Sequence, residues 1–99
     1  MALSANKMKQ YRTLGHSLNP IVTIAAKGVT DNVLAEINRA LEDHELIKIK
    51  VAVVDRDARK AAIQEVCTSS NAQLVQEIGK VALLFREAAK PDPRKSNIR

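Results

Sequence analysis

Hydrophobic residues recur at two different spacings along this chain, and the two spacings alternate. Near the amino end they recur every three residues, as on one face of a helix: Met8, Tyr11 and Leu14. Ser4 can cap this predicted helix and Gly15 can end it. Residues 21–25 form a short apolar run, β-branched in part, that predicts a buried strand.

The middle of the chain repeats this alternation. Thr30 can cap a second helix, whose apolar stripe at helical spacing is Val33, Ile37, Ala40, Leu41 and His44. Residues 46–54 then alternate, with Ile47, Ile49, Val51 and Val53 on one side and Lys48 and Lys50 on the other. This pattern predicts a strand with one covered face and one face at least partly open to water.

The last third of the sequence predicts a helix and two strands. Asp55 or Asp57 can cap the helix. Residues 72–78 and 81–85 predict the strands, joined at Gly79-Lys80, where glycine can adopt a positive φ. The resulting order α-β-α-β-α-β-β predicts an α+β fold in which helices pack on a four-stranded mixed sheet.

We expect one domain over residues 1–88. Residues 89–99 contain two prolines and four basic residues with little apolar content. Such a segment buries little surface, so we expect a mobile basic tail.

The formal net charge of +5 is unevenly placed along the 99 residues. Residues 1–30 hold four bases and no acid, residues 31–57 hold seven acids and four bases, and residues 90–99 hold four bases and one acid. Basic ends therefore flank a net acidic middle. This asymmetry favours a polyanionic partner on one side of the molecule, although solubilising charge alone can give a similar composition.

Aromatic residues are scarce, since Tyr11 and Phe85 are the only two. Proteins that bind single-stranded RNA usually stack its bases on exposed aromatic rings. A nucleic-acid partner of this chain would instead be bound through phosphates, riboses and shape, which favours folded RNA.

The sequence shows no pattern typical of an enzyme, so we expect no catalytic residues and no cofactor. His16 and His44 lack the spacing of metal ligands, so we expect no metal. The single Cys67 excludes an intramolecular disulfide and favours a reducing compartment. With no apolar run near 18 residues and no hydrophobic signal core, we expect a cytoplasmic protein with no membrane or small-molecule partner.

The stretch TIAAKGVTDN, residues 23–32, places a lysine and a glycine between a strand and a helix. One explanation is a turn that requires a positive φ at Gly28. The other is a close approach to a phosphate, with Lys27 and the free amides of the second helix as donors. Asp31 would repel a phosphate on the helix axis, so the phosphate would lie on the side of Lys27.

Four stretches carry a resemblance to a known family: LGHSLNPIV, GVTDNVLAEI, HELIKIKV and QEIGKVALLFR. In this order and spacing they resemble the YhbY family, the stand-alone bacterial form of the CRM RNA-binding domain, from about Leu3 to Arg86. The resemblance implies a fold similar to the C-terminal domain of bacterial translation initiation factor 3. It also implies non-catalytic association with precursors of the large ribosomal subunit.

Members of this family carry a GxxG loop, which has been likened to the loop with which KH domains clamp a nucleic-acid backbone. The matching tetrad here is AAKG, which keeps only the second glycine. We interpret Gly28 as the glycine needed for a positive φ, and Ala25 and Ala26 as small residues that keep the approach open. Lys27 would then contact a phosphate directly.

We therefore predict a cytoplasmic, monomeric protein that binds structured ribosomal RNA, or the pre-50S particle, without catalysis. The predicted RNA-binding residues are Ala25, Ala26, Lys27 and Gly28 in the loop, Lys7, Lys9 and Arg12 on the first helix, and Lys48 and Lys50 on the second strand. A solvated sheet face also favours lysine, and Lys80 could simply flank its turn. The alternatives are a ribosome-associated adaptor that binds protein and a small enzyme that acts on nucleic acid.

Overall fold

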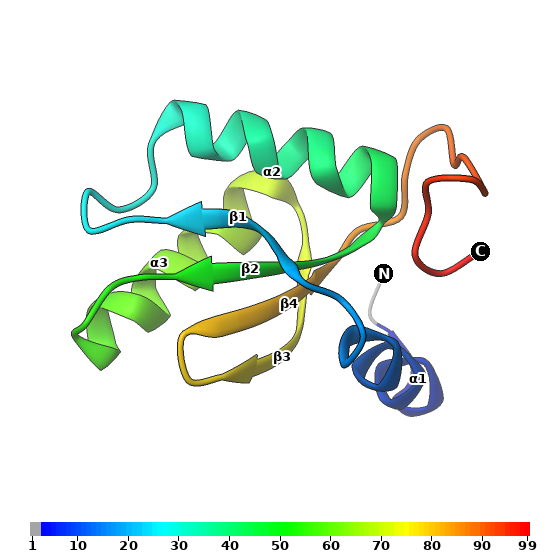
Figure 1. Ribbon diagram of the computed structural model, residues 1–99, viewed down its shortest axis with the longest axis horizontal. Coiled ribbons are helices and arrows are strands. Elements are labelled where there is room, and N and C mark those ends of the chain that lie inside the picture. The colour runs from blue at the N-terminus through cyan, green and yellow to red at the C-terminus, as the bar shows by residue number, and fades with distance from the viewer. Residues whose placement is uncertain (1–2) are drawn as a thin grey trace.

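The computed structural model describes residues 3–99, and within this range the chain forms three helices and four strands (Figure 1). In chain order they are α1 (Ala5–Gly15), β1 (Pro20–Ile24), α2 (Asp31–His44), β2 (Leu46–Val51), α3 (Arg56–Ser70), β3 (Gln73–Ile78) and β4 (Val81–Phe85). The predicted α-β-α-β-α-β-β order and the α+β class are confirmed. No helix in the described range is long and apolar enough to cross a lipid bilayer.

The strands form one mixed sheet in the order β1-β2-β4-β3. β1 and β2 are parallel, so the chain must cross over between them, and α2 makes that crossover. β4 is antiparallel to both β2 and β3, and a tight turn at Gly79 joins β3 to β4. Gly79 has the expected positive φ of 57°.

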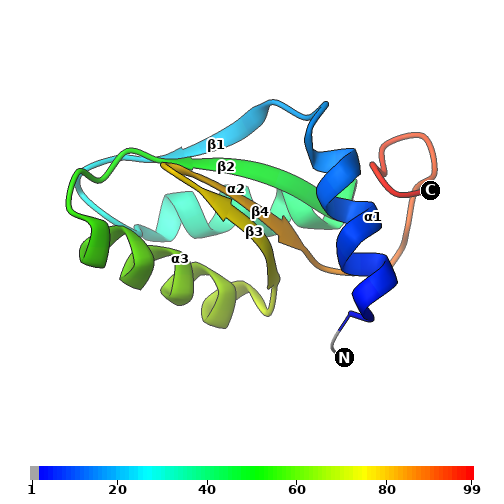
Figure 2. The same cartoon turned by 90° about the horizontal axis from the view of Figure 1, so that it is seen from below.

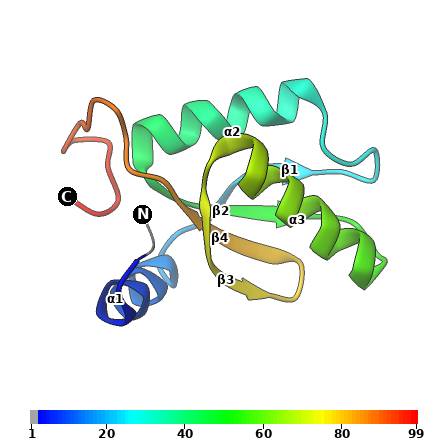
Figure 3. The same ribbon diagram turned by 180° about the vertical axis from the view of Figure 1, so that it is seen from behind.

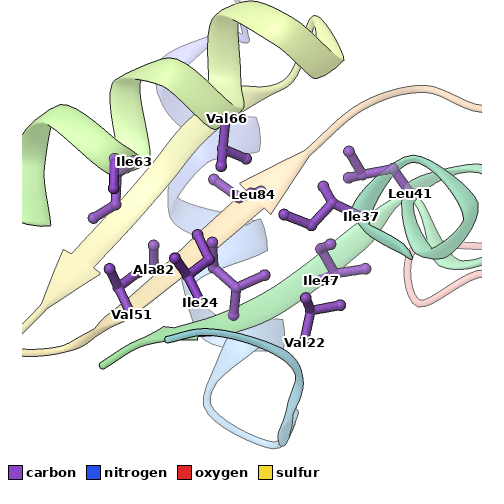
Figure 4. Close-up of a cluster of buried hydrophobic side chains, with 12 residues drawn as sticks. Val22, Ile24, Ile37, Leu41, Ile47, Val51, Ile63, Val66, Ala82 and Leu84 are labelled. Atoms are coloured by element: carbon purple, nitrogen blue, oxygen red, sulfur yellow. The ribbon is translucent and has the colours of Figure 1, made fainter. Parts of the chain in front are cut away.

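Alternation along β2 sends its side chains into two separate cores. Ile47, Ile49 and Val51 face α2 and α3, where they meet Ile37, Leu41, Ile63 and Val66 in the larger core (Figure 4). Leu46 faces the other side and packs with Tyr11 of α1, Val75 and Leu83. The sheet therefore has α2 and α3 on one face and α1 on the other. Figure 3, which views the molecule from the side opposite to Figure 1, shows α3 in front of the strands. We call the face that carries α1 the α1 face.

Each of the three helices has a cap that the sequence predicted. The Ser4 hydroxyl accepts from the amide of Lys7 at 3.2 Å. The Thr30 hydroxyl accepts from the amide of Val33 at 3.2 Å. At α3 the cap is Asp55 rather than Asp57, with its carboxylate 2.8 Å from the amide of Ala58. β2 ends three residues earlier than the expected strand 46–54, because the chain turns away after Ala52 donates to the carbonyl of Ile24.

α1 ends at Gly15, as expected, and the structure shows a packing reason for a glycine at this position. This glycine is the last residue of the helix, and it is buried against the sheet. A Cβ at this position would lie 2.5 Å from Cδ2 of Leu83. The glycine is therefore needed for the close approach of α1 to β4.

The carboxyl-terminal segment lies against the end of α2, at the same end of the molecule as α1 (Figure 1, right). The side-chain amide of Asn97 donates to the carbonyl of Leu46 at 2.7 Å, and its backbone amide donates to the carbonyl of His44 at 2.9 Å. The amide of Lys90 donates to the carboxylate of Glu42 at 3.0 Å.

Glu45 is the centre of this arrangement. Its carboxylate is fully buried and accepts hydrogen bonds from Arg99 at 2.6 and 3.1 Å, from Ser96 at 2.8 Å and from the amide of Ala88 at 2.8 Å. These bonds, chiefly the one from Arg99, lower the pKa of Glu45 to about 2. The expectation of a mobile tail came from its prolines, its bases and its few apolar residues, and the polar partners of Glu45 are not visible in such a composition. The mobility of residues 89–99 in solution stays a prediction.

Candidate nucleic-acid interface

The loop between β1 and α2 is a tight turn. The amide of Gly28 donates to the carbonyl of Ala25 at 2.9 Å, and Gly28 has a φ of 86°. The interpretation of Gly28 as the glycine needed for a positive φ is therefore confirmed. No heavy atom lies within 4 Å of a Cβ built there, so the requirement comes from the backbone angle and not from lack of space.

The residues around this turn leave polar groups open to a ligand. Ala25, Ala26 and Lys27 are exposed. Thr30 satisfies the amides of Val33 and Leu34, through its hydroxyl and its carbonyl. The amides at the very start of α2 therefore have no acceptor within the helix, and they point out at the end where its dipole is positive.

Two further segments, the one after β2 and the turn between β3 and β4, lie at the same end of the sheet as this turn. Parallel strands end at the same edge of a sheet, and the amide of Ala52, just after β2, donates to the carbonyl of Ile24 at 2.7 Å. The amide of Val51 donates to the carbonyl of Lys80 at 2.6 Å, which fixes the β3–β4 turn at the same edge. We call this edge the loop end, made of residues 25–30, 52–55 and 79–80.

Lys48 and Lys50 lie on the α1 face of the sheet, because they alternate with the core residues of β2 and share the side of Leu46. Lys50 pairs with Thr23 of β1 and with Val81 of β4, one residue from Lys80. Lys48 pairs with Pro20 and Leu83, one step nearer α1. The two lysines therefore connect the loop end with the middle of the α1 face.

The basic residues of α1 lie at the other end of the molecule. Figures 1 and 2 both show α1 and the loop between β1 and α2 at opposite ends of the sheet, and the longest dimension of the molecule is 34 Å. Lys7, Lys9 and Arg12 are exposed, and Nζ of Lys7 lies 5.9 Å from the centroid of the Tyr11 ring. The structure therefore does not gather the predicted residues into one pocket. It distributes them from one end of the molecule to the other.

Ion pairing is concentrated elsewhere. Within residues 3–99 the ion pairs either join the end of α2 to the chain after β4, as in Glu42 with Arg86, Asp43 with Lys95 and Glu45 with Arg99, or lie within the chain after β4. None of these described pairs uses a cation of α1, of β2 or of the loop end. We call these unpaired cations the basic track: Lys7, Lys9, Arg12, Lys27, Lys48, Lys50 and Lys80.

Sequence reasoning missed Lys80 as a member of the track. It flanks its turn, as expected, but strand pairing also places that turn at the same end of the sheet as the loop that holds Lys27. Only the order β1-β2-β4-β3 could have indicated this, and hydrophobic periodicity does not give strand order. Arg59, by contrast, has a structural role, because its guanidinium donates to the carbonyls of Val53 and Val54 at 3.0 Å each.

The described residues contain no cluster of three metal-ligating side chains. Burial raises the pKa of the Cys67 thiol, which makes the reactive thiolate scarce. The cations of the basic track and the first amides of α2 offer charge and hydrogen bonding.

Known proteins are similar to this chain over most of its length. The sequence pattern of the CRS1 / YhbY (CRM) domain matches residues 3–86, which include α1, the loop and all four strands. The chain belongs to this family. The match ends at Arg86, so the segment that binds Glu45 lies outside it.

Relatives cover nearly the whole chain. It is 49% identical to Probable RNA-binding protein PA4753 of Pseudomonas aeruginosa, over 99% of this chain and 94% of that protein. It is 42% identical to an RNA-binding protein of Haemophilus influenzae, over 96% of this chain and all of that protein. The solution structure of SAV1595 of Staphylococcus aureus, named as a candidate RNA-binding protein, superposes with a TM-score of 0.78 at 29% identity, covering 90% of this chain and 93% of that one.

Proposed function

We propose that this protein binds structured RNA through the phosphates, along the basic track. The observation that carries the proposal is the separation of charge: the cations of the track have no acidic partners among the described residues, while the acids at the end of α2 are paired. Phosphate contacts of this kind supply most of the sequence-independent affinity for nucleic acid. The relatives named as RNA-binding proteins support RNA as the polyanion.

The two aromatic rings support a folded RNA rather than a single strand. Tyr11 and Phe85 pack on each other with their ring centroids 4.9 Å apart, and Tyr11 is buried. Since the chain has no other aromatic residue, no ring is left to form an exposed stacking platform. Recognition by shape and backbone, which double-stranded RNA allows, suits this surface better.

The two ends of the track would bind different phosphates of one RNA. Lys27 and Lys80, with the first amides of α2, would contact phosphate at the loop end. Arg12 and its neighbours on α1 would contact a second region, and Lys48 and Lys50 would contact the backbone between them. Binding of this kind uses no reacting group, so the proposed role is not catalytic.

The proposed RNA is ribosomal, in precursors of the large subunit, and the proposed protein is a cytoplasmic monomer. The resemblance to the YhbY family supports this finer assignment, as does the likeness to the C-terminal domain of translation initiation factor 3 that it implies. Ultraviolet crosslinking in cells, followed by sequencing of the RNA adducts, tests it. Adducts concentrated in large-subunit RNA are expected, and they should fall in a variant with Lys27→Ala and Lys80→Ala. Adducts spread evenly over cellular RNA would contradict the ribosomal assignment.

An adaptor role is the second candidate, and one observation favours it. Val54 and Ile78 are 85% and 63% exposed, and an apolar protein interface would cover them. An apolar protein interface would bind nearly independently of salt, whereas phosphate binding weakens steeply as salt rises. Salt dependence therefore distinguishes the two candidates.

A further inference from the structure

The α1 face is not fully covered by α1, and the uncovered part forms a hollow of about 390 Å³. This volume falls in the range of pockets that bind small ligands, roughly 300–1,000 Å³. The hollow lies between the segment that follows α1 and the strands β2, β4 and β3. It is therefore in the middle of the basic track, and Lys48 of the track lines it.

The lining combines apolar walls with free polar groups. Pro20, Ile78 and Val81 supply aliphatic surface. His16, Asn19 and Gln76 supply hydrogen-bonding side chains. None of the hydrogen bonds among the described residues uses the side chains of these three polar residues.

We infer that this hollow receives a single unpaired nucleobase of the bound RNA. The inference rests on the proposed function and adds to it a site that reads a base. A nucleobase has flat apolar faces and a polar edge, which suit the aliphatic walls and the free side chains. The base would enter while the flanking phosphates bind Lys48 and Lys50 on the same face.

The geometry also explains why the base must be unpaired. The major groove of an RNA helix is too deep and narrow for side chains to read, whereas a base in a bulge can leave the stack. A protein that binds the backbone on both sides of a bulge would place that base over the uncovered part of the sheet. The walls of this hollow are aliphatic, whereas bases usually stack on aromatic rings. We therefore expect the base to contribute only a moderate part of the binding free energy.

The test compares two RNA hairpins that differ by one unpaired nucleotide in the stem. Fluorescence anisotropy at fixed salt gives the Kd of each hairpin for the wild-type protein. We expect the bulged hairpin to bind about 3- to 10-fold more tightly, as one or two additional hydrogen bonds would give. Equal binding of the two hairpins would overturn the base site and leave the proposed function intact. Binding of neither hairpin would overturn both.

Matched variants locate the site. Ile78→Ala removes an aliphatic wall and, because the side chain is 63% exposed, should leave the fold intact. Leu74→Ala is the control, since it makes the same kind of truncation on the same strand but lines a different hollow, beside α3. We expect Ile78→Ala to reduce the preference for the bulged hairpin without changing the Kd of the paired one, and Leu74→Ala to keep the preference in full. Loss of the preference in Leu74→Ala, or its full retention in Ile78→Ala, would overturn the assignment to this hollow.

A second variant addresses the edge of the base. Gln76→Ala removes one of the free amides, so we expect it to reduce the differences in Kd among hairpins that carry A, C, G or U at the bulge. Unchanged differences would show that the base is not read by this side chain and would overturn that part of the inference.

Discussion

The amide of Val51 donates a hydrogen bond to the carbonyl of Lys80 across 2.6 Å. This bond joins the end of β2 to the turn between β3 and β4, and it places that turn at the same end of the sheet as the loop that holds Lys27. The positive charge at the loop end therefore comes from segments far apart in the sequence. The account of RNA binding depends on these segments acting together.

Lys27 and Lys80 should contribute to RNA binding and not to the fold. Both side chains are exposed and make no ion pair among the described residues. We expect Lys27→Ala and Lys80→Ala each to leave the Tm unchanged, to weaken binding at low salt, and to reduce the slope of log K against log salt by about 1. Lys60→Ala is the control, because this exposed lysine lines a hollow on the α3 side of the sheet. If Lys60→Ala weakened binding as much, the track would not be the binding surface.

Gly28 should contribute to the fold through its backbone angle. Since its φ is 86° and the space around it is open, Gly28→Ala should destabilise the protein by about 1–2 kcal/mol, measured by urea unfolding. Gly28→Asn should cost less, because asparagine tolerates the left-handed region better. Equal stability of the alanine variant and the wild type would show that the loop can adopt another conformation.

Gly15 should contribute through close packing. A Cβ there would lie 2.5 Å from Cδ2 of the buried Leu83, and overpacking of this kind costs about 1–3 kcal/mol. The gain in helix propensity from Gly15→Ala, about 1 kcal/mol, offsets part of this cost. We expect Gly15→Ala to lower the free energy of unfolding of the wild-type protein. In the Leu83→Val background, where the side chain at position 83 is smaller, we expect Gly15→Ala to lower it by less. A purely additive double-mutant cycle would contradict the packing explanation.

Much of this fold is predictable because local signals agree with it. The apolar stripe and Thr30 indicate α2, and the strand at 81–85 has the bounds expected from its sequence. The positive φ of Gly28 follows from its place between a strand and a helix. Contacts between distant segments are not predictable in this way, because no local pattern encodes them. The placement of Lys27 and Lys80 at one end of the sheet, and the contact of Gly15 with Leu83, are of this kind.

The carboxyl-terminal segment is the clearest example of a distant contact. Composition predicts that its removal leaves stability nearly unchanged, but the bonds of Arg99 and Ser96 to Glu45 predict a loss. Charged hydrogen bonds contribute about 1.5–3 kcal/mol each, so Arg99→Ala should lower the Tm by several degrees, roughly 5 °C or more. Arg94→Ala is the control, since that side chain is 93% exposed and pairs only with the nearby Asp92 in the described residues. An unchanged Tm in Arg99→Ala would favour the mobile tail.

The same cluster should make stability depend on pH. The pKa of Glu45 is lowered from 4.5 to about 2, chiefly by the hydrogen bond from Arg99. A lowered pKa in the folded state means that the stabilisation is fully present above about pH 4.5 and is lost as the pH falls towards 2. Urea unfolding from pH 6 to pH 2 should show wild type more stable than Glu45→Gln at pH 6, with the difference shrinking below pH 4.5. A difference that stayed constant down to pH 2 would mean that Glu45 does not titrate as a buried ion pair.

The salt dependence of binding to a structured RNA tests the central claim most directly. If the basic track neutralises about 4 to 6 phosphates, the slope of log K against log salt should lie between about −3 and −5 for the wild-type protein. Fluorescence anisotropy with a labelled ribosomal RNA fragment, over a series of salt concentrations, gives this slope. A slope in that range is the predicted result, and a slope near zero would contradict binding through the phosphates.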